Sequence, residues 1–222
     1  SINSSSGVLS FSSTPNFEVP TASNGDHVYT VIVTVTDNGS LTDTQTITIT
    51  VTDGNEAPVI TSNSGGNTAS ISYAENTSSA VTTVTSTDAD AGASATYTIS
   101  GGADSGDFAI SSGVLTFAST PDYENPADAD TDNEYVVIVQ VSDGTNTDTQ
   151  TITVTVTDVN DAPVITSNSG GSTASISYAE NATSAVTTVT STDDDAGASA
   201  TYTISGGADS GDFAISSGVL TF

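Results

Sequence analysis

Almost every side chain of this protein that could take part in chemistry is a carboxylate. The 222 residues include 27 Asp and Glu, one His, no Cys, no Lys and no Arg, which gives a formal net charge of −27. Carboxylates bind hard cations such as calcium, whereas thiolate and imidazole sites need Cys or several His. A chain without basic side chains cannot neutralise phosphate groups, so nucleic acid is a poor partner. The composition therefore restricts any bound metal to a hard cation held by oxygen.

Carboxylates that are far apart in sequence can share an ion only if a regular fold brings them together. Glu56–Phe117 returns almost unchanged as Asp161–Phe222, 105 residues later. The segment GVLSFSSTPNFEVP, which starts at Gly7, is similar to GVLTFASTPDYENP, which starts at Gly113. Such a period is that of a whole β-sandwich rather than of a solenoid unit. We expect the C-terminal half of a repeat at 1–57, a complete repeat at 58–162, and the N-terminal half of the next repeat at 163–222.

The complete repeat contains seven runs of alternating apolar and polar residues, bounded by Gly, Asn, Asp or Ser. They cover roughly 69–73, 79–87, 94–100, 107–110, 113–118, 134–142 and 147–157. In the last two runs the residues expected to face the core are Tyr135, Val137, Val139, Val141, Ile152, Val154 and Val156. The predicted fold class is all-β, as tandem seven-stranded Greek-key β-sandwiches with an immunoglobulin-like architecture.

Five acidic motifs occur in a fixed order within one period. They are Ala74-Glu75-Asn76, Asp88-Ala89-Asp90, Asp122-Tyr123-Glu124, Asp143-Gly144 and Asp158-Val159-Asn160-Asp161-Ala162-Pro163. This order resembles that of the cadherin repeat, and most of all the cadherin-like repeats of large bacterial surface proteins. The chain departs from the animal cadherin pattern at Pro121 and Tyr123, where Leu and Arg would stand, and at Val141, where Ala would stand.

The resemblance implies calcium sites at the junctions between repeats, with ligands at strand ends on the poles of the sandwiches. For the junction of the second and third repeats the candidate ligands are Glu75, Asp122, Glu124, Asp158, the Val159 carbonyl, Asn160, Asp161, the Ala162 carbonyl, Asp193 and Asp195. For the junction of the first and second repeats they are Glu18, Asp53, Asn55, Glu56, Asp88, Asp90 and Asp143. The first junction has fewer carboxylates, so we expect weaker calcium binding there.

The acidic residues allow two other interpretations. The run Asp128-Ala129-Asp130-Thr131-Asp132 resembles the start of an EF-hand loop, but Asn133 and Val139 stand where that loop needs Gly and a bidentate Glu. It is therefore interpreted as a solvated loop. Paired carboxylates can also hydrolyse glycosides, but no general acid in an apolar pocket can be identified. No enzymatic activity is expected.

The expected function is that of a calcium-rigidified extracellular spacer, stalk or filament module of a repetitive bacterial surface adhesin. The alternative is a calcium-dependent carbohydrate-binding or homophilic adhesion module. The near-identity of the repeats favours a spacer, and the absence of Trp argues against an aromatic binding cleft. The expected partners are calcium ions, neighbouring repeats of the same chain and, in a fibre, other copies. No apolar run approaches the length of a membrane span, so direct membrane insertion is not expected.

The two terminal segments each correspond to half a sandwich, which would leave a sheet face uncovered. A fibre in which one copy's tail completes the next copy's head would supply the GVLTF strand twice, at Gly218–Phe222 and again at Gly7–Phe11. We therefore expect the sequence to be a window of a longer repetitive chain.

Overall fold

The computed structural model describes all of residues 1–222, and these group into two compact units. Unit 1 consists of Ser1–Ile71, Ser79–Ala118 and Val136–Thr153, and unit 2 of Ser72–Ser78, Ser119–Tyr135 and Val154–Phe222. The division follows contacts and not sequence repeats, so the three-domain organisation stays a prediction.

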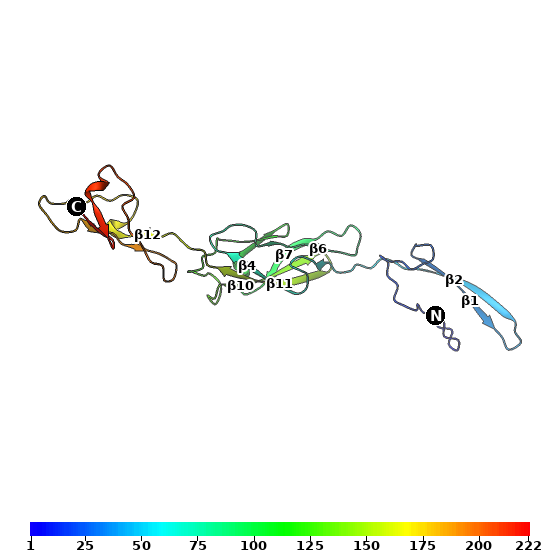
Figure 1. The fold of residues 1–222 in the computed structure, drawn as a ribbon. Helices are drawn as coiled ribbons and strands as arrows, with labels where there is room; N and C mark the ends of the chain where they lie inside the picture. The colour runs from blue at the N-terminus through cyan, green and yellow to red at the C-terminus, as the bar shows by residue number, and fades with distance from the viewer. The chain divides into compact units, whose positions relative to one another are not determined.

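A long β-hairpin begins the regular structure of unit 1. Strands β1 (Val28–Thr36) and β2 (Thr42–Thr50) pair antiparallel, with Val28 opposite Thr50 and Thr36 opposite Thr42 (Figure 1). In the connecting turn, Asp37 Oδ1 accepts hydrogen bonds from the N–H groups of Gly39 and Leu41, both at 2.8 Å. The local side-chain acceptor replaces ladder bonds that the turn cannot make.

The predicted complete repeat is a β-sandwich. One sheet has the strand order β4 (Thr68–Ala74), β11 (Thr147–Thr157), β10 (Glu134–Ser142), β7 (Thr96–Gly101) (Figure 1). A second sheet has the order β5 (Thr82–Thr83), β9 (Val114–Phe117), β8 (Phe108–Ser111), and β3 (Val59–Ile60) pairs with β6 (Ser86–Thr87). The all-β class predicted from the sequence is confirmed.

One of the seven predicted strands, 79–87, was wrong in detail. It is two strands with different partners, because β5 pairs with β9 whereas β6 pairs with β3. Strand β3, only two residues long, was not predicted at all. A strand that changes partner keeps its alternating pattern, so periodicity alone does not reveal the break.

The core forms where alternating strand residues turn inward, as predicted. Tyr135, Val137, Val139 and Val141 of β10 are each at most 1% exposed. Ile152, Val154 and Val156 of β11 are buried to the same extent. From the second sheet, Leu115 and Phe108 are also buried. Burying such side chains contributes about 1.5–3 kcal/mol each, which holds the strand ends, and the carboxylates on them, in place.

The remaining regular structure of unit 2 consists of short strands. Strand β12 (Val164–Ile165) pairs with β14 (Ser191–Thr192), and β13 (Thr187–Thr188), β16 (Val219–Thr221) and β15 (Ala214–Ser216) form a three-stranded sheet in that order. The helical turns are the 3₁₀ segments η1 (Ser105–Asp107), η2 (Ser167–Ser169) and η3 (Ser210–Asp212). None of these helices is long and apolar enough to cross a membrane.

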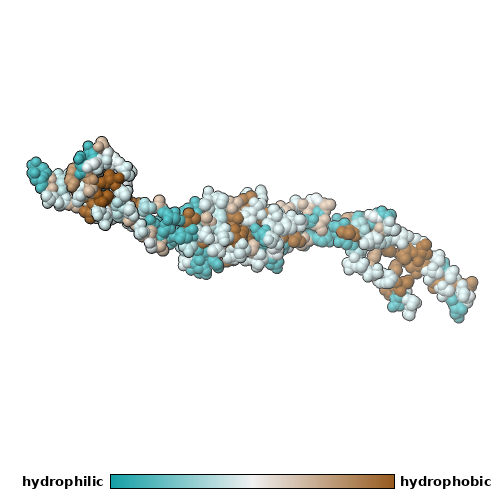
Figure 2. Space-filling model, in the orientation of Figure 1, coloured by the Kyte–Doolittle hydropathy of each residue, from teal (hydrophilic) through white to brown (hydrophobic).

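Apolar side chains lie exposed on the β1–β2 hairpin and within residues 163–222. Figure 2 shows brown surface over both segments, and Ile32 and Phe222 are 67% and 69% exposed. In residues 163–222 an open apolar concavity of about 740 Å³ is lined by Val189, Tyr202 and Phe213, among others. These faces have the alternating pattern of a sandwich interior but lack a covering layer.

Candidate metal centre

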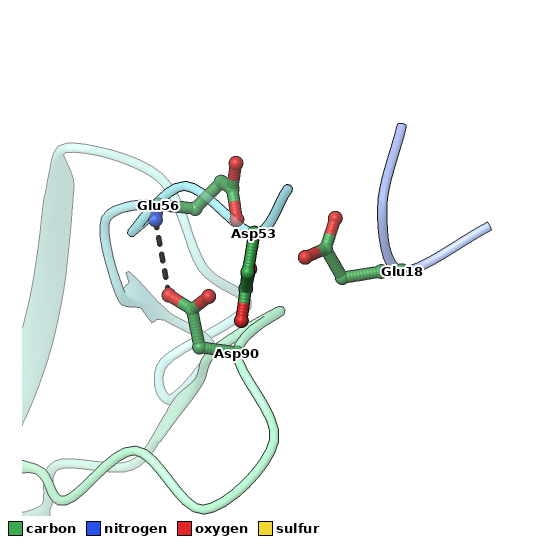
Figure 3. A group of neighbouring side chains, drawn as sticks. All are labelled: Glu18, Asp53, Glu56 and Asp90. Atoms are coloured by element: carbon green, nitrogen blue, oxygen red, sulfur yellow. Dashed lines mark hydrogen bonds between the residues drawn. The ribbon is translucent and has the colours of Figure 1, made fainter. Parts of the chain in front are cut away.

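Four carboxylates of unit 1 converge on one another. Glu18, Asp53, Glu56 and Asp90 each offer an oxygen that lies within 4.8 Å of the others, and we call this group the Glu56 cluster. Figure 3 shows their carboxylates gathered around a shared space, with Glu18 approaching from a separate stretch of chain. No Lys or Arg exists in the chain to neutralise them.

Hydrogen bonds along the backbone fix the Glu56 cluster. Glu56 N–H donates to Asp90 Oδ2 at 3.0 Å, the bond drawn in Figure 3. Asp90 N–H in turn donates to Asp88 Oδ1 at 3.0 Å. Asp88 therefore orients Asp90 through a short acidic turn, and the structure does not place Asp88 in the cluster itself.

Asp143, in the turn after β10, holds the linker segment 53–56. Its Oδ2 accepts from Asn55 Nδ2 at 2.7 Å, and its Oδ1 accepts from the N–H groups of Thr145 and Asn146. The Asn146 N–H, then the Asn55 amide and the Thr145 N–H, lower the pKa of Asp143. Asp143 is thus already satisfied by donors and holds the linker, outside the Glu56 cluster.

A second and larger group of carboxylates occurs in unit 2. Glu75, Asp122 and Glu124 converge within 4.8 Å, and Glu124, Asp158 and Asp195 do so as well. We call these five residues the Glu124 cluster, because Glu124 belongs to both triads. The motifs that supply them span 120 positions of the sequence, from Glu75 to Asp195.

Glu75 anchors the second cluster from within the sandwich. Its side chain is 1% exposed, and both of its oxygens accept backbone hydrogen bonds. Oε1 accepts from Val159 N–H at 2.8 Å and Oε2 from Tyr123 N–H at 2.7 Å. Charge-assisted bonds of this kind are strong, so Glu75 ties the linker and the Asp122–Glu124 loop to the end of β4.

The linker around Asp161 repeats the geometry seen at Glu56. Asp161 N–H donates to Asp195 Oδ2 at 2.8 Å, and Asp195 N–H donates to Asp193 Oδ1 at 3.2 Å. Asp161 Oδ1 accepts from Asn76 Nδ2 at 2.9 Å, and Asn160 Nδ2 donates to the Asp161 carbonyl at 2.8 Å. These contacts place Asp161, Asn160 and Asp193 beside the Glu124 cluster.

The pKa values of Glu56, Glu124 and Asp158 are raised. Removal from water raises the pKa of Glu124, and the charges of Glu75, Asp158 and Asp195 raise it further. The same cause comes first for Asp158, where Asp195 and Glu75 add to it. In the Glu56 cluster, removal from water and the charge of Glu18 are the largest causes of the raised pKa of Glu56. Neither cluster has a positively charged side chain to relieve this repulsion, because the chain contains no Lys or Arg.

The donor set fits calcium. Glu124 Oε2 is buried and has no hydrogen-bond partner, although it lies in the one residue that both triads share. A buried carboxylate oxygen without a donor is costly unless a cation compensates it. Calcium takes six to eight oxygen ligands in flexible geometry, and carboxylates supply up to two each. The five residues of the Glu124 cluster would be its side-chain ligands there, and the four of the Glu56 cluster would be those at the other site.

Some of the predicted ligands stay predictions. The carbonyls of Val159 and Ala162 belong to this group, as do the amides of Asn55 and Asn160. Sequence reasoning overlooked Asn146, whose Nδ2 donates to the carbonyls of Asn55 and Glu56 at 3.1 and 3.2 Å. Its only sequence signal is its place in the turn after Asp143-Gly144.

Comparison with known proteins agrees with this architecture. A family model described as "Cadherin domain" matches residues 68–157. The crystal structure of mouse protocadherin-24 EC1-3 is similar with a TM-score of 0.51 and 24% identity, covering 100% of this chain and 72% of that chain. At this identity the likeness concerns the fold alone.

Two further structures are similar at lower scores. The protocadherin gamma B7 structure of extracellular cadherin domains 1-4 has a TM-score of 0.47 and 22% identity, covering 77% of this chain and 42% of that chain. For human protocadherin-24 EC1-2 the values are 0.47 and 19%, with 72% and 76% covered. The chain thus spans less than half of the gamma B7 fragment. No curated protein matched the chain. Residues 68–157 therefore match the cadherin-domain model, and the chain is similar in fold to cadherin extracellular domains.

Proposed function

We propose that this chain is a calcium-binding extracellular spacer built from cadherin-like repeats at 1–57, 58–162 and 163–222. Cadherin domains are extracellular adhesion-type modules without enzymatic activity, and the proposal places this chain in that class. A spacer role within a repetitive bacterial surface adhesin is the specific form that we favour, because the repeats are nearly identical.

The observation that carries the proposal is Glu124 Oε2. It is buried, has no partner, and belongs to a residue shared by two carboxylate triads in a chain without Lys or Arg. Calcium would supply the missing positive charge. Without it, the acidic groups repel one another and the linkers act as hinges. With it, ligands from successive repeats are held together, and the angle between those repeats becomes fixed.

Calcium affinities typical of extracellular modules would suit an extracellular role. Calcium sites of extracellular modules have dissociation constants of about 10⁻⁴–10⁻³ M, so they fill outside cells and stay empty at cytosolic calcium. A spacer with such sites would stiffen on export. The ligands that we propose are the carboxylates of the two clusters. Further oxygen ligands would come from Asn55, Asn160, Asp161 and the carbonyls of Val159 and Ala162.

Thermal melting tests the proposal. A ligand that binds only the folded state adds about 2.7 kcal/mol at a hundredfold excess over its dissociation constant. Calcium at 10 mM should therefore raise the Tm clearly above that in chelator, and magnesium at 10 mM should raise it less. A Tm that is the same in calcium and in chelator would contradict the proposal.

A further inference from the structure

The loop that precedes β10 holds a third acidic group, separate from both clusters. Oxygens of Asp128, Asp130 and Asp132 lie within 4.8 Å of one another, and we call these residues the loop triad. From the sequence this run was interpreted as solvated. That interpretation is wrong for Asp128, which is only 4% exposed.

One oxygen of Asp128 is left without a donor. Its Oδ2 accepts from Asp132 N–H at 2.8 Å, but its Oδ1 is buried with no hydrogen-bond partner. The neighbouring Asn133 also keeps a buried Oδ1 without a partner. A carboxylate shielded from water, beside two other carboxylates, needs a compensating positive charge.

The first repeat offers a natural comparison, because a loop of the same length stands there without the triad. Thr14–Tyr29 aligns with Thr120–Tyr135, which puts Ala22 at the place of Asp128 and Asn24 at that of Asp130. Two hydrogen bonds occur in both loops. Tyr29 hydroxyl accepts from Thr21 N–H at 3.1 Å, as the Tyr135 hydroxyl does from Ala127 N–H at 3.0 Å.

The second of these two bonds agrees as well. Asp26 Oδ1 accepts from Val28 N–H at 2.8 Å, and Asp132 Oδ1 accepts from Glu134 N–H at 2.8 Å. These two bonds therefore form without Asp128 or Asp130, whereas the Asp132 N–H bond to Asp128 and the positive φ of Asn133 have no counterpart in the first repeat. The presence of Asp128 and Asp130 calls for an explanation beyond these two bonds, and binding a cation provides one.

The two loops differ in the side-chain hydrogen bond to their last Asp, which is Asp26 in the first repeat and Asp132 in the second. In the first repeat Asn24 Nδ2 donates to Asp26 Oδ2 at 2.6 Å. In the second repeat Asp130 stands at that place, and an ionised carboxylate has no hydrogen to donate. A cation between the carboxylates would supply the attraction that the Asn24 amide supplies in the first repeat.

The departure from the EF-hand pattern at Asn133 is not an obstacle. The Gly of that pattern is needed for a sharp turn, and Asn133 adopts φ 65° in its place. Asn is among the few residues that enter the left-handed region readily. The three Asp residues keep the spacing of the first three ligands of such a loop.

We propose that the loop triad is a calcium site that belongs to the single sandwich and not to a junction between repeats. Its side-chain ligands are Asp128, Asp130 and Asp132. Three carboxylates on a flexible loop favour calcium over magnesium, which demands near-ideal octahedral geometry and keeps its waters. The ion would tie the loop to the start of β10. The site does not depend on the clusters around Glu56 and Glu124.

The test is calorimetric titration of the full chain with calcium after removal of metal by chelator. The variant is Asp130→Asn/Asp132→Asn, since both residues are exposed and Asn keeps the Oδ1 that accepts from Glu134. The matched control is Asp158→Asn/Asp195→Asn, which changes the Glu124 cluster and leaves the loop triad intact. The loop variant should bind one calcium ion fewer per chain than the native protein, and the control should retain that ion.

Melting provides a second readout that a merely structural role would not reproduce. In chelator, the loop variant and Asp128→Asn should melt at or above the native Tm, because repulsion is relieved. In 10 mM calcium both should melt below it. Unchanged calcium stoichiometry in the loop variant, a lower Tm already in chelator, or an equal response to magnesium would overturn the proposal. Loss of calcium binding at the control sites alone would bear on the proposed function and not on this site.

Discussion

Replacing Glu75 by Gln should destabilise the complete repeat strongly, even without calcium. Glu75 is 1% exposed, and each of its oxygens accepts one backbone N–H, from Val159 at 2.8 Å and from Tyr123 at 2.7 Å. Gln keeps one acceptor but turns an NH₂ group toward the other N–H. One charge-assisted bond is lost, at about 1.5–3 kcal/mol, and one buried N–H is left unsatisfied, at about 1–3 kcal/mol.

Removing a buried charge offsets part of this loss, which leaves a net cost of about 2–4 kcal/mol. At roughly 4–8 °C per kcal/mol for a domain of this size, the Tm should fall by about 8–32 °C. The assay is urea denaturation and thermal melting in chelator, followed by circular dichroism and tyrosine fluorescence.

Glu180→Gln is the matched control. Glu180 stands at the same place of the next repeat, 105 residues on, but its side chain is exposed. Its substitution should change the free energy of unfolding by less than about 0.5 kcal/mol. A cost below about 1 kcal/mol for Glu75→Gln, or equal costs for the two variants, would refute the role assigned to Glu75.

Three further predictions follow from the core, the linker and the charges. Ile152→Ala should lower the free energy of unfolding in urea by about 2–5 kcal/mol, because Ile152 is fully buried. Ile165→Ala should lower it far less, because Ile165 is 52% exposed. Equal losses for the two variants would contradict the burial argument. Asp161→Ala removes the acceptor of Asn76 Nδ2, so it should weaken calcium binding in calorimetry while the Tm in chelator changes little; loss of the folded repeat would show that Asp161 is misplaced. The pKa of Glu124 is raised in the folded state, so its protonated form stabilises the fold in chelator at pH values below that pKa. This contribution is lost as the pH rises through the pKa. The Tm in chelator should therefore increase as the pH is lowered from neutral toward the ordinary carboxyl range. The lowered pKa of Asp143 acts in the opposite sense at still lower pH, and a Tm that falls steadily from pH 7 downward would contradict this account.

Alternation along the strands predicted most of the fold. The runs at 134–142 and 147–157 coincide with β10 and β11, and their inward residues form the core. Such long strands have one buried face, so period two is unambiguous. The short strands β3, β5 and β6 are two residues each, too short for any period to appear.

The acidic motifs predicted which carboxylates converge, but not what each one does. Asp88 and Asp193 were expected as ligands, and the structure shows them accepting the N–H groups of Asp90 and Asp195. The distinction depends on side-chain direction within a turn, which spacing does not encode. The burial of Asp128 was not predicted, because the run was interpreted as a solvated loop once Asn133 and Val139 were found in place of Gly and the bidentate Glu.

The central claim is that calcium stiffens this chain by joining successive repeats. Small-angle X-ray scattering of the same sample in chelator and then in 10 mM calcium tests it most directly. We predict a larger maximum dimension and a narrower distribution of interatomic distances in calcium, with the change reduced in Asp158→Asn/Asp195→Asn. Superimposable scattering curves with and without calcium, from a protein shown by calorimetry to bind the ion, would contradict it.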